Sequence, residues 1–159
     1  MIPYMIEAHL RLRHQGFEHL VHAPAMTAQE LAAAEHVSGR HVAKPVIVRM
    51  GGQLAIAVVA ATDQVDLASL EEATGLGAEL VAEEEFARRF APCEAGAEPP
   101  LAVFGFPIYV DAKLENERTL VMPAGTHEDA VVLDTHEWMR CERVQPISHL
   151  GARPSGRGV

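Results

Sequence analysis

The chain has 159 residues, of which 48% are hydrophobic and 22% charged, a composition typical of one globular domain. Its net charge of −9 argues against a surface that grips DNA or RNA along its whole length, because phosphate neutralisation needs clustered Lys and Arg. No segment approaches about 18 apolar residues, so no membrane-spanning helix is expected, and the first residues lack a secretory pattern. We therefore expect a cytoplasmic protein with neither a membrane nor DNA as partner.

Apolar periodicity, turn residues and helix caps predict a mixed series of helices and strands. One strong signal is the capping box Thr27-Ala-Gln-Glu30, in which the Thr hydroxyl and the Glu carboxylate each bond a backbone amide of the other. A second is the pair Gly51-Gly52 between two β-branched runs, which predicts a hairpin turn. In chain order we expect helices at 5–15, from Thr27 to Gly39, and at 66–74, 83–90 and 135–141, and strands at 18–23, 42–50, 54–62, 106–111, 118–123 and 130–133.

This order mixes hairpins with crossovers and favours an α+β fold with a mixed sheet. We expect a single domain over residues 1–150, followed by a frayed tail at 151–159. Residues 91–102 are small, Gly- and Pro-rich and lack periodicity, so they predict a loop that is long enough to suggest a function.

Basic residues are unevenly placed. Residues 36–62 contain Arg40, Lys44 and Arg49 and no Asp or Glu, either because their strands are buried or because they form an electropositive pocket. Eleven of the 13 basic residues are Arg, and only Lys44 and Lys113 are Lys. At the start of an apolar strand, a compact Lys44 ammonium suits a phosphate or a carbonyl; the alternative is a solvated strand-end lysine.

Two short segments are further candidates. Gly96 to Pro100 has a glycine that permits close approach of a ligand to the backbone and a rigid exit, which suits a loop that offers fixed amides and carbonyls to a substrate. Gly125-Thr126-His127 follows a strand, and His127 suits an acid, base or hydrogen-bond donor near neutral pH. Read alone, each is also consistent with an ordinary surface turn.

Several classes of site are not indicated. The histidine pairs show no metal-binding spacing, so we expect no metal, and no cofactor fingerprint is present. The sequence contains no GxSxG, P-loop or Rossmann motif. Cys93 has no histidine partner in sequence and is interpreted as a packed thiol, and the two cysteines are too few for a disulfide framework.

Taken together, these motifs resemble the YbaK/prolyl-tRNA synthetase-associated domain family, in its free-standing branch related to the alanyl-tRNA(Pro) deacylases. The likeness covers about residues 19–146 and rests on the order and separation of the motifs. They are the Ala-rich capping-box helix, Val42-Ala43-Lys44, Gly96-x-x-x-Pro100 and Ala124-Gly125-Thr126-His127. The resemblance implies a barrel-like mixed sheet flanked by helices, and a hydrolase that removes a wrong amino acid from tRNA in trans.

The resemblance also implies roles for individual residues. Lys44 matches the essential lysine that holds the terminal adenosine and phosphate region, and Gly96 matches the loop glycine whose backbone positions the ester. His127 matches a histidine of the alanine-specific branch. We therefore expect Lys44, Gly96 and His127 to be catalytic, and Arg40, Ala97 and Pro100 to bind substrate. After Pro100 many relatives continue with Phe-Gly, whereas this chain has Leu101-Ala102-Val103-Phe104-Gly105, which puts the cognate amino acid in doubt.

The implied substrate is Ala-tRNA(Pro), recognised at its acceptor end, with a prolyl-tRNA synthetase or an elongation factor as alternative partners that present it. Such editing is needed because the proline pocket of a synthetase discriminates against the smaller alanine by only about 1–3 kcal/mol per methylene. Two other readings stay open. One is a non-catalytic module that binds a tRNA end or a synthetase; the other is hydrolysis of a small ester outside tRNA.

Overall fold

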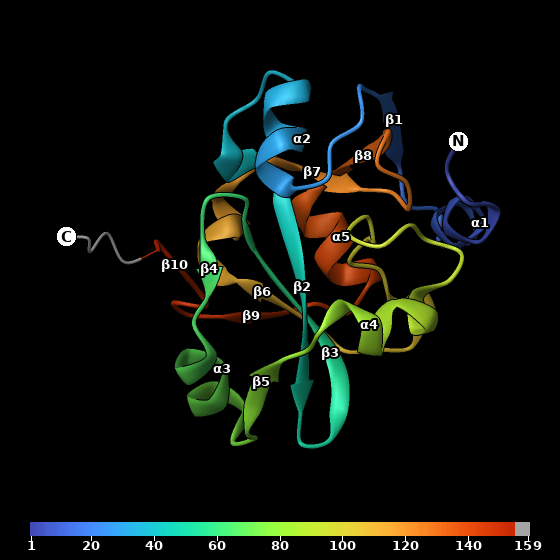
Figure 1. The fold of residues 1–159 in the computed structure, drawn as a ribbon. Helices are drawn as coiled ribbons and strands as arrows, with labels where there is room; N and C mark the ends of the chain where they lie inside the picture. Colours follow the sequence, from blue (N-terminus) through green and yellow to red (C-terminus); the bar gives the residue numbers. More distant parts are fainter. Residues whose placement is uncertain (155–159) are drawn as a thin grey trace.

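The structure, a computed structural model, describes residues 1–154 (Figure 1). Its α-helices are α1 (Tyr4–Leu12), α2 (Ala28–Ala34), α3 (Leu67–Thr74), α4 (Glu83–Phe86) and α5 (Thr135–Cys141). Its strands are β1 (Phe17–Val21), β2 (Ala43–Met50), β3 (Gln53–Ala60), β4 (Gln64–Val65), β5 (Ala78–Leu80), β6 (Ile108–Asp111), β7 (Thr119–Pro123), β8 (Asp129–Asp134), β9 (Gln145–Ile147) and β10 (Gly151–Ala152). Short 3₁₀ turns are η1 (Gly39–His41), η2 (Ala87–Phe90), η3 (Ala102–Phe104) and η4 (Ala112–Asn116).

The largest sheet has the order β5-β2-β3-β6-β9 and is mixed. β5, β2 and β3 are antiparallel, whereas β3, β6 and β9 are parallel. The β2–β3 hairpin pairs Met50 with Gln53, and its two turn glycines, Gly51 and Gly52, have φ values of 56° and 88°. The predicted hairpin is thus confirmed, and glycine is required there because both positions lie in the left-handed region.

A second, antiparallel sheet has the order β1-β8-β7, and a third consists of β10 and β4. A single parallel bridge from Val42 to Val121 connects the start of β2 to β7. The α+β class with a mixed sheet is therefore confirmed. Across residues 1–154 the strands form three sheets rather than a closed barrel.

The bridge between sheets places one end of β2 at a junction of several elements. In Figure 1, α2 lies beside the start of β2, at the end of the molecule away from the β2–β3 turn and α3. The β7–β8 hairpin lies at the same end. Since Lys44 is the second residue of β2, the fold presents it at this junction.

The predicted loop at 91–102 is confirmed. Hydrogen bonds from α5 and from Glu142, the residue after it, hold the end of this loop in place. The indole N–H of Trp138 donates to the Pro100 carbonyl at 2.9 Å, and the Ala102 N–H donates to the buried Glu142 carboxylate at 2.7 Å. Trp138 is fully buried. These bonds satisfy the Pro100 carbonyl and the Ala102 N–H, and they hold the end of the loop against the core.

Several predicted boundaries were wrong: the first helix ends at Leu12 rather than at residue 15, and the helix expected at 83–90 is α4 followed by the 3₁₀ turn η2. The capping box begins α2 as expected, but the helix ends at Ala34 rather than at Gly39, because His36 adopts a positive φ of 57° and the chain restarts as η1 with a Ser38 cap. Residues 151–152 are not frayed, since β10 pairs with β4. Residues 155–159 of the expected tail lie outside the described residues.

Candidate active site

A cavity of about 250 Å³ opens at the junction of α2, β2, the 94–98 loop and the β7–β8 turn. Its walls are mainly small apolar groups with a few polar side chains among them, the combination that orients a small ligand. The lining residues are His22, Ala25, Met26, Thr27, Ala28, Leu31, Lys44, Pro45, Gly96, Ala97, Pro123, Thr126 and Asp129. Of the six residues predicted from the sequence, it brings together Lys44, Gly96 and Ala97.

Lys44 is half-buried in the wall of this cavity. Its Nζ donates to the backbone carbonyl oxygen of Asp63. Desolvation lowers the pKa of the Lys44 ammonium, and the nearby charge of Asp63 opposes that shift. The lysine therefore carries a partly dehydrated positive charge, which interacts more strongly with an incoming anion than a solvated lysine does.

The 94–98 loop, which lines the cavity with Gly96 and Ala97, is bonded to the β7–β8 turn at two points. The Gly125 N–H donates to the Ala97 carbonyl and the Glu94 N–H donates to the Gly125 carbonyl, both at 2.8 Å. Gly96 lies between these bonds with φ 89°, a conformation that favours glycine. A side chain is therefore disfavoured where the loop faces the cavity.

The Gly96 amide is already engaged. It donates to the Glu98 carboxylate at 3.1 Å, and the Ala97 amide donates to the Glu94 carbonyl at 3.0 Å. Glu98 is only 6% exposed, and this burial raises the pKa of its carboxyl group. The expected offer of fixed loop amides is thus wrong for these two positions as they stand, and Lys44 remains the positive group facing the cavity.

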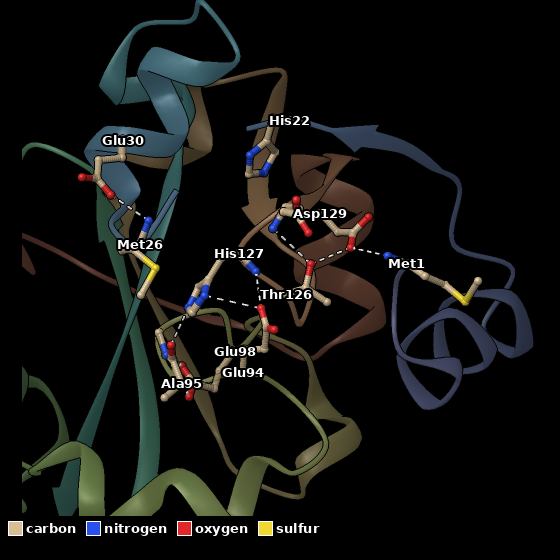
Figure 2. Close-up of polar contacts among 12 residues, drawn as sticks. Met1, His22, Met26, Glu30, Glu94, Ala95, Glu98, Thr126, His127 and Asp129 are labelled. Carbon is tan, nitrogen blue, oxygen red and sulfur yellow. Dashed lines mark hydrogen bonds and ion pairs between the residues drawn. The ribbon is translucent and has the colours of Figure 1, made fainter. Parts of the chain in front are cut away.

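His127 holds the loop instead of lining the cavity (Figure 2). Its backbone N–H donates to the Glu94 carboxylate at 2.7 Å, and its ring Nε2 bonds the Ala95 carbonyl at 2.7 Å. Because a carbonyl can only accept, Nε2 must carry the proton. These two bonds, which we call the His127 clamp, hold the loop immediately before Gly96.

Asp129 is a lining residue that the sequence analysis missed. Its carboxylate accepts bonds from the Thr126 hydroxyl at 2.5 Å and from the Met1 amino group at 2.7 Å (Figure 2). It also bonds His19 Nε2 at 2.6 Å. Burial alone would raise its pKa, but these hydrogen bonds outweigh burial and lower the pKa of Asp129 to about 2. One wall of the cavity therefore holds an ionised carboxylate, signalled in sequence only by an acid at the start of an apolar run.

His22 is the second residue that the sequence analysis missed. It follows β1, and its backbone N–H donates to the Glu128 carbonyl at 2.9 Å, which sets it beside Asp129. Its ring Nδ1 bonds the Ala23 carbonyl at 2.7 Å. Nε2 is buried and has no hydrogen-bond partner among residues 1–154. Because the Ala23 carbonyl can only accept, Nδ1 is the donor, and in the tautomer protonated there Nε2 is an acceptor.

Two predicted residues lie elsewhere. Pro100 is buried and bonds Trp138 through its carbonyl, so it supports the loop from behind. Arg40 lines a neighbouring cavity, together with Lys113 and Arg153. Cys93 is half-buried, and burial with the nearby Glu98 charge raises the pKa of its thiol to about 12, which fits the packed thiol inferred from the sequence.

Within residues 1–154 no group of three or more His, Cys, Asp or Glu could hold a metal ion. No helix in the same residues is long and apolar enough to cross a bilayer.

The fold and this cavity define a small α+β domain whose cavity combines small apolar walls with the charged groups of Lys44 and Asp129. Residues 22–141, which include every lining residue of the cavity, match the aminoacyl-tRNA editing domain family. The chain belongs to that family, as its motifs indicated. No curated protein matches it.

Solved structures agree on the fold. A hypothetical protein, APE2540, is similar with a TM-score of 0.81 and 20% identity, over 90% of this chain and 98% of its own. A candidate trans-editing enzyme for prolyl tRNA synthetase gives 0.73 and 19%, over 92% and 98%. A protein from Marinobacter aquaeolei VT8, described as a candidate signal transduction protein, gives 0.74 and 14% over 99% of this chain but 32% of its own.

Proposed function

We propose that this protein is a cytoplasmic deacylase that hydrolyses mischarged aminoacyl-tRNA in trans, with Ala-tRNA(Pro) as its substrate. The observation that carries the proposal is the cavity of about 250 Å³ in an editing-domain chain, with Lys44 in its wall. The similar structure of a candidate trans-editing enzyme for prolyl tRNA synthetase supports the same substrate class.

The walls of the cavity suit a small aliphatic side chain. Ala25, Ala28, Leu31, Ala97 and Pro123 contribute short or rigid apolar groups to it. A methyl group fits such walls without unpaired polar atoms, whereas the cyclic proline side chain has to displace them. We infer that this sieve admits alanine and excludes proline, which complements the synthetase pocket.

The charged groups suit the two ends of an aminoacyl ester. The desolvated Lys44 ammonium holds the phosphate region of the terminal adenosine. On the adjoining wall, His22 Nε2 accepts a hydrogen bond from the α-ammonium of the amino acid, and the ionised Asp129 favours that positive charge. Opposite charges at opposite ends fix the ester in one orientation.

The reaction needs only an oriented water molecule. Water attacks the ester carbonyl carbon, the bond to the ribose 3′ oxygen breaks, and alanine and a free tRNA 3′ hydroxyl are released. The 2′ hydroxyl of the same ribose is the group we expect to orient the water, and the Gly96 loop, clamped by His127, positions the ester.

The experiment is a deacylation assay on Ala-, Ser-, Cys- and Pro-tRNA(Pro) side by side. We expect rapid loss of Ala-tRNA(Pro) with Pro-tRNA(Pro) spared. Rapid loss of a different ester would change the assigned amino acid. Binding to tRNA ends without hydrolysis of any ester would instead support the non-catalytic binding module.

A further inference from the structure

A second cavity of about 250 Å³ lies next to the first and has a different character. Three of its lining residues are basic, and they come from three separate segments: η1, η4 and the chain after β10. The lining residues are Arg40, Ala60, Thr62, Asp63, Lys113, Leu114, Asn116, Glu117 and Arg153. Nothing in the proposed ester chemistry uses this cavity.

Asp63 lines the second cavity, and the only two lysines of the chain both contact it. Lys44 Nζ, from the first cavity, donates to the Asp63 carbonyl oxygen. Lys113 Nζ, from the second, lies 2.5 Å from the Asp63 carboxylate. Asp63 is only 2% exposed, so this buried residue contacts one lysine from each cavity, Lys44 through its carbonyl and Lys113 through its carboxylate.

The second cavity keeps an excess of positive charge. It has three basic lining residues and two acids; Asp63 lies 2.5 Å from Lys113, which also lies 3.8 Å from Asp111, and Glu117 lies 2.5 Å from His41. Arg40 and Arg153 are exposed and make no ion pair within residues 1–154. A guanidinium bonds phosphate oxygens in a bidentate manner, which makes two of them at one cavity suited to a phosphodiester.

We propose that this second cavity, which we call the Arg40–Arg153 site, binds a backbone phosphate of the tRNA acceptor strand. The inference rests on the proposed function: with the aminoacyl adenosine in the first cavity, the preceding nucleotides leave past Lys44, and the adjacent Arg40–Arg153 site offers them its positive charge. Such contacts position the strand without reading its sequence. Because the chain has a net charge of −9, these phosphate contacts confine RNA binding to the part of the surface around the two cavities.

The first test compares two substrates that differ in phosphate. The double variant Arg40→Gln/Arg153→Gln is assayed on Ala-tRNA(Pro) and on the 3′-alanyl ester of adenosine, which has no phosphate. We expect kcat/KM to fall at least about 10-fold more on the tRNA than on the nucleoside ester. Arg88→Gln/Arg140→Gln is the matched control, because it removes the same charge from two exposed arginines outside both cavities. Equal losses on both substrates, or equal losses in the two double variants, would overturn the proposal.

A second test does not depend on turnover. The full chain is titrated with an RNA oligonucleotide that ends in CCA and carries no amino acid. The titration is repeated at several salt concentrations. Loss of one phosphate contact on a single strand reduces the slope of log Kd against log salt by about 0.7. We expect that reduction in Arg40→Gln/Arg153→Gln and not in the control. An unchanged slope overturns the phosphate site, whereas absence of deacylation by the wild type with this reduction present would overturn the proposed function alone.

Discussion

His22 shows how one side chain can serve structure and substrate through different atoms. Its Nδ1 bonds the Ala23 carbonyl, while its buried Nε2 has no partner among residues 1–154. An unsatisfied buried acceptor costs about 1–3 kcal/mol, and a donor on the substrate relieves that cost. The two ring nitrogens can be separated by substitution, since an Asn amide reaches the Nδ1 position and a Gln amide reaches the Nε2 position.

We predict that His22→Asn lowers kcat/KM for Ala-tRNA(Pro) by about 10-fold, and that His22→Gln stays within about 3-fold of wild type. The reason is that only Gln returns an acceptor to the α-ammonium. A propionyl ester, which lacks that group, provides the control, and the two variants should hydrolyse it equally. If His22→Asn were the more active variant, the Nδ1 bond rather than Nε2 would be what matters.

Glu98 connects burial to pH. Desolvation raises the pKa of its carboxyl above the ordinary 4.5, so the folded chain holds this proton more tightly than the unfolded chain does. The contribution of Glu98 to stability is therefore fully present below pH 4.5 and is lost as pH rises through the folded-state pKa.

We accordingly predict that Glu98→Gln raises the urea midpoint at pH 8 and changes it little at pH 4. The amide keeps an oxygen for the Gly96 N–H but carries no charge to desolvate. Unfolding curves of both proteins at the two pH values measure this. A variant less stable than wild type at pH 8 would show that the carboxylate charge is needed.

At the scale of elements, the loop at 94–98 and the β7–β8 turn behave as one unit through the two bonds at Gly125 and the His127 clamp. Gly96 and Gly52 form a natural pair for testing that unit, because their φ values are 89° and 88°. A Cβ at Gly96 would meet only ordinary contacts, 3.5 Å from the Met26 carbonyl, and a Cβ at Gly52 would meet open space. Backbone strain is therefore the shared cost.

We predict that Gly96→Ala and Gly52→Ala each destabilise the protein by about 1–2 kcal/mol. Only Gly96→Ala should lower deacylation, by about 10-fold or more, since only it shifts the loop at the cavity. Denaturant midpoints and initial rates on Ala-tRNA(Pro) separate the two effects. Equal activity of the two variants would make the Gly96 loop structural.

Elements with local signals were predictable, and elements made by distant pairing were not. The capping box at Thr27 and the Gly51-Gly52 turn fix their own geometry through neighbouring residues, and both were found where expected. β4, β5, β9 and β10 were missed because each has only two or three residues, too few to show a period, and exists through its partner strand. The end of α2 was misplaced because a left-handed histidine, unlike glycine, carries no terminating signal.

The same distinction between local signals and distant pairing applies to the residues of the site. Lys44, Gly96 and Ala97 stand in motifs and meet in the cavity. His22 and Asp129 were missed because the pairing of β1 with β8 brings them there, which no short-range pattern reports. Arg40, expected to bind substrate, lines the second cavity instead.

For the whole molecule, charge distribution sets how a substrate can approach. A net charge of −9 opposes binding of RNA over the whole surface, yet the Lys44 cavity and the Arg40–Arg153 site are linked by the bond from Lys44 to Asp63. We propose that residues 1–150 act as one domain that engages only the acceptor end, with a prolyl-tRNA synthetase or an elongation factor presenting the tRNA. Charge-driven encounter of this kind weakens as salt rises.

Single-turnover hydrolysis of Ala-tRNA(Pro) by wild type and by Lys44→Met tests the proposed role of Lys44 in deacylation. Methionine keeps an unbranched stem but removes the ammonium, so we predict a loss of about 100-fold or more. The unfolding free energy should not fall, because the desolvated Lys44, whose pKa is lowered, is no source of stability at neutral pH. A stable Lys44→Met protein that hydrolyses Ala-tRNA(Pro) at the wild-type rate would contradict the account.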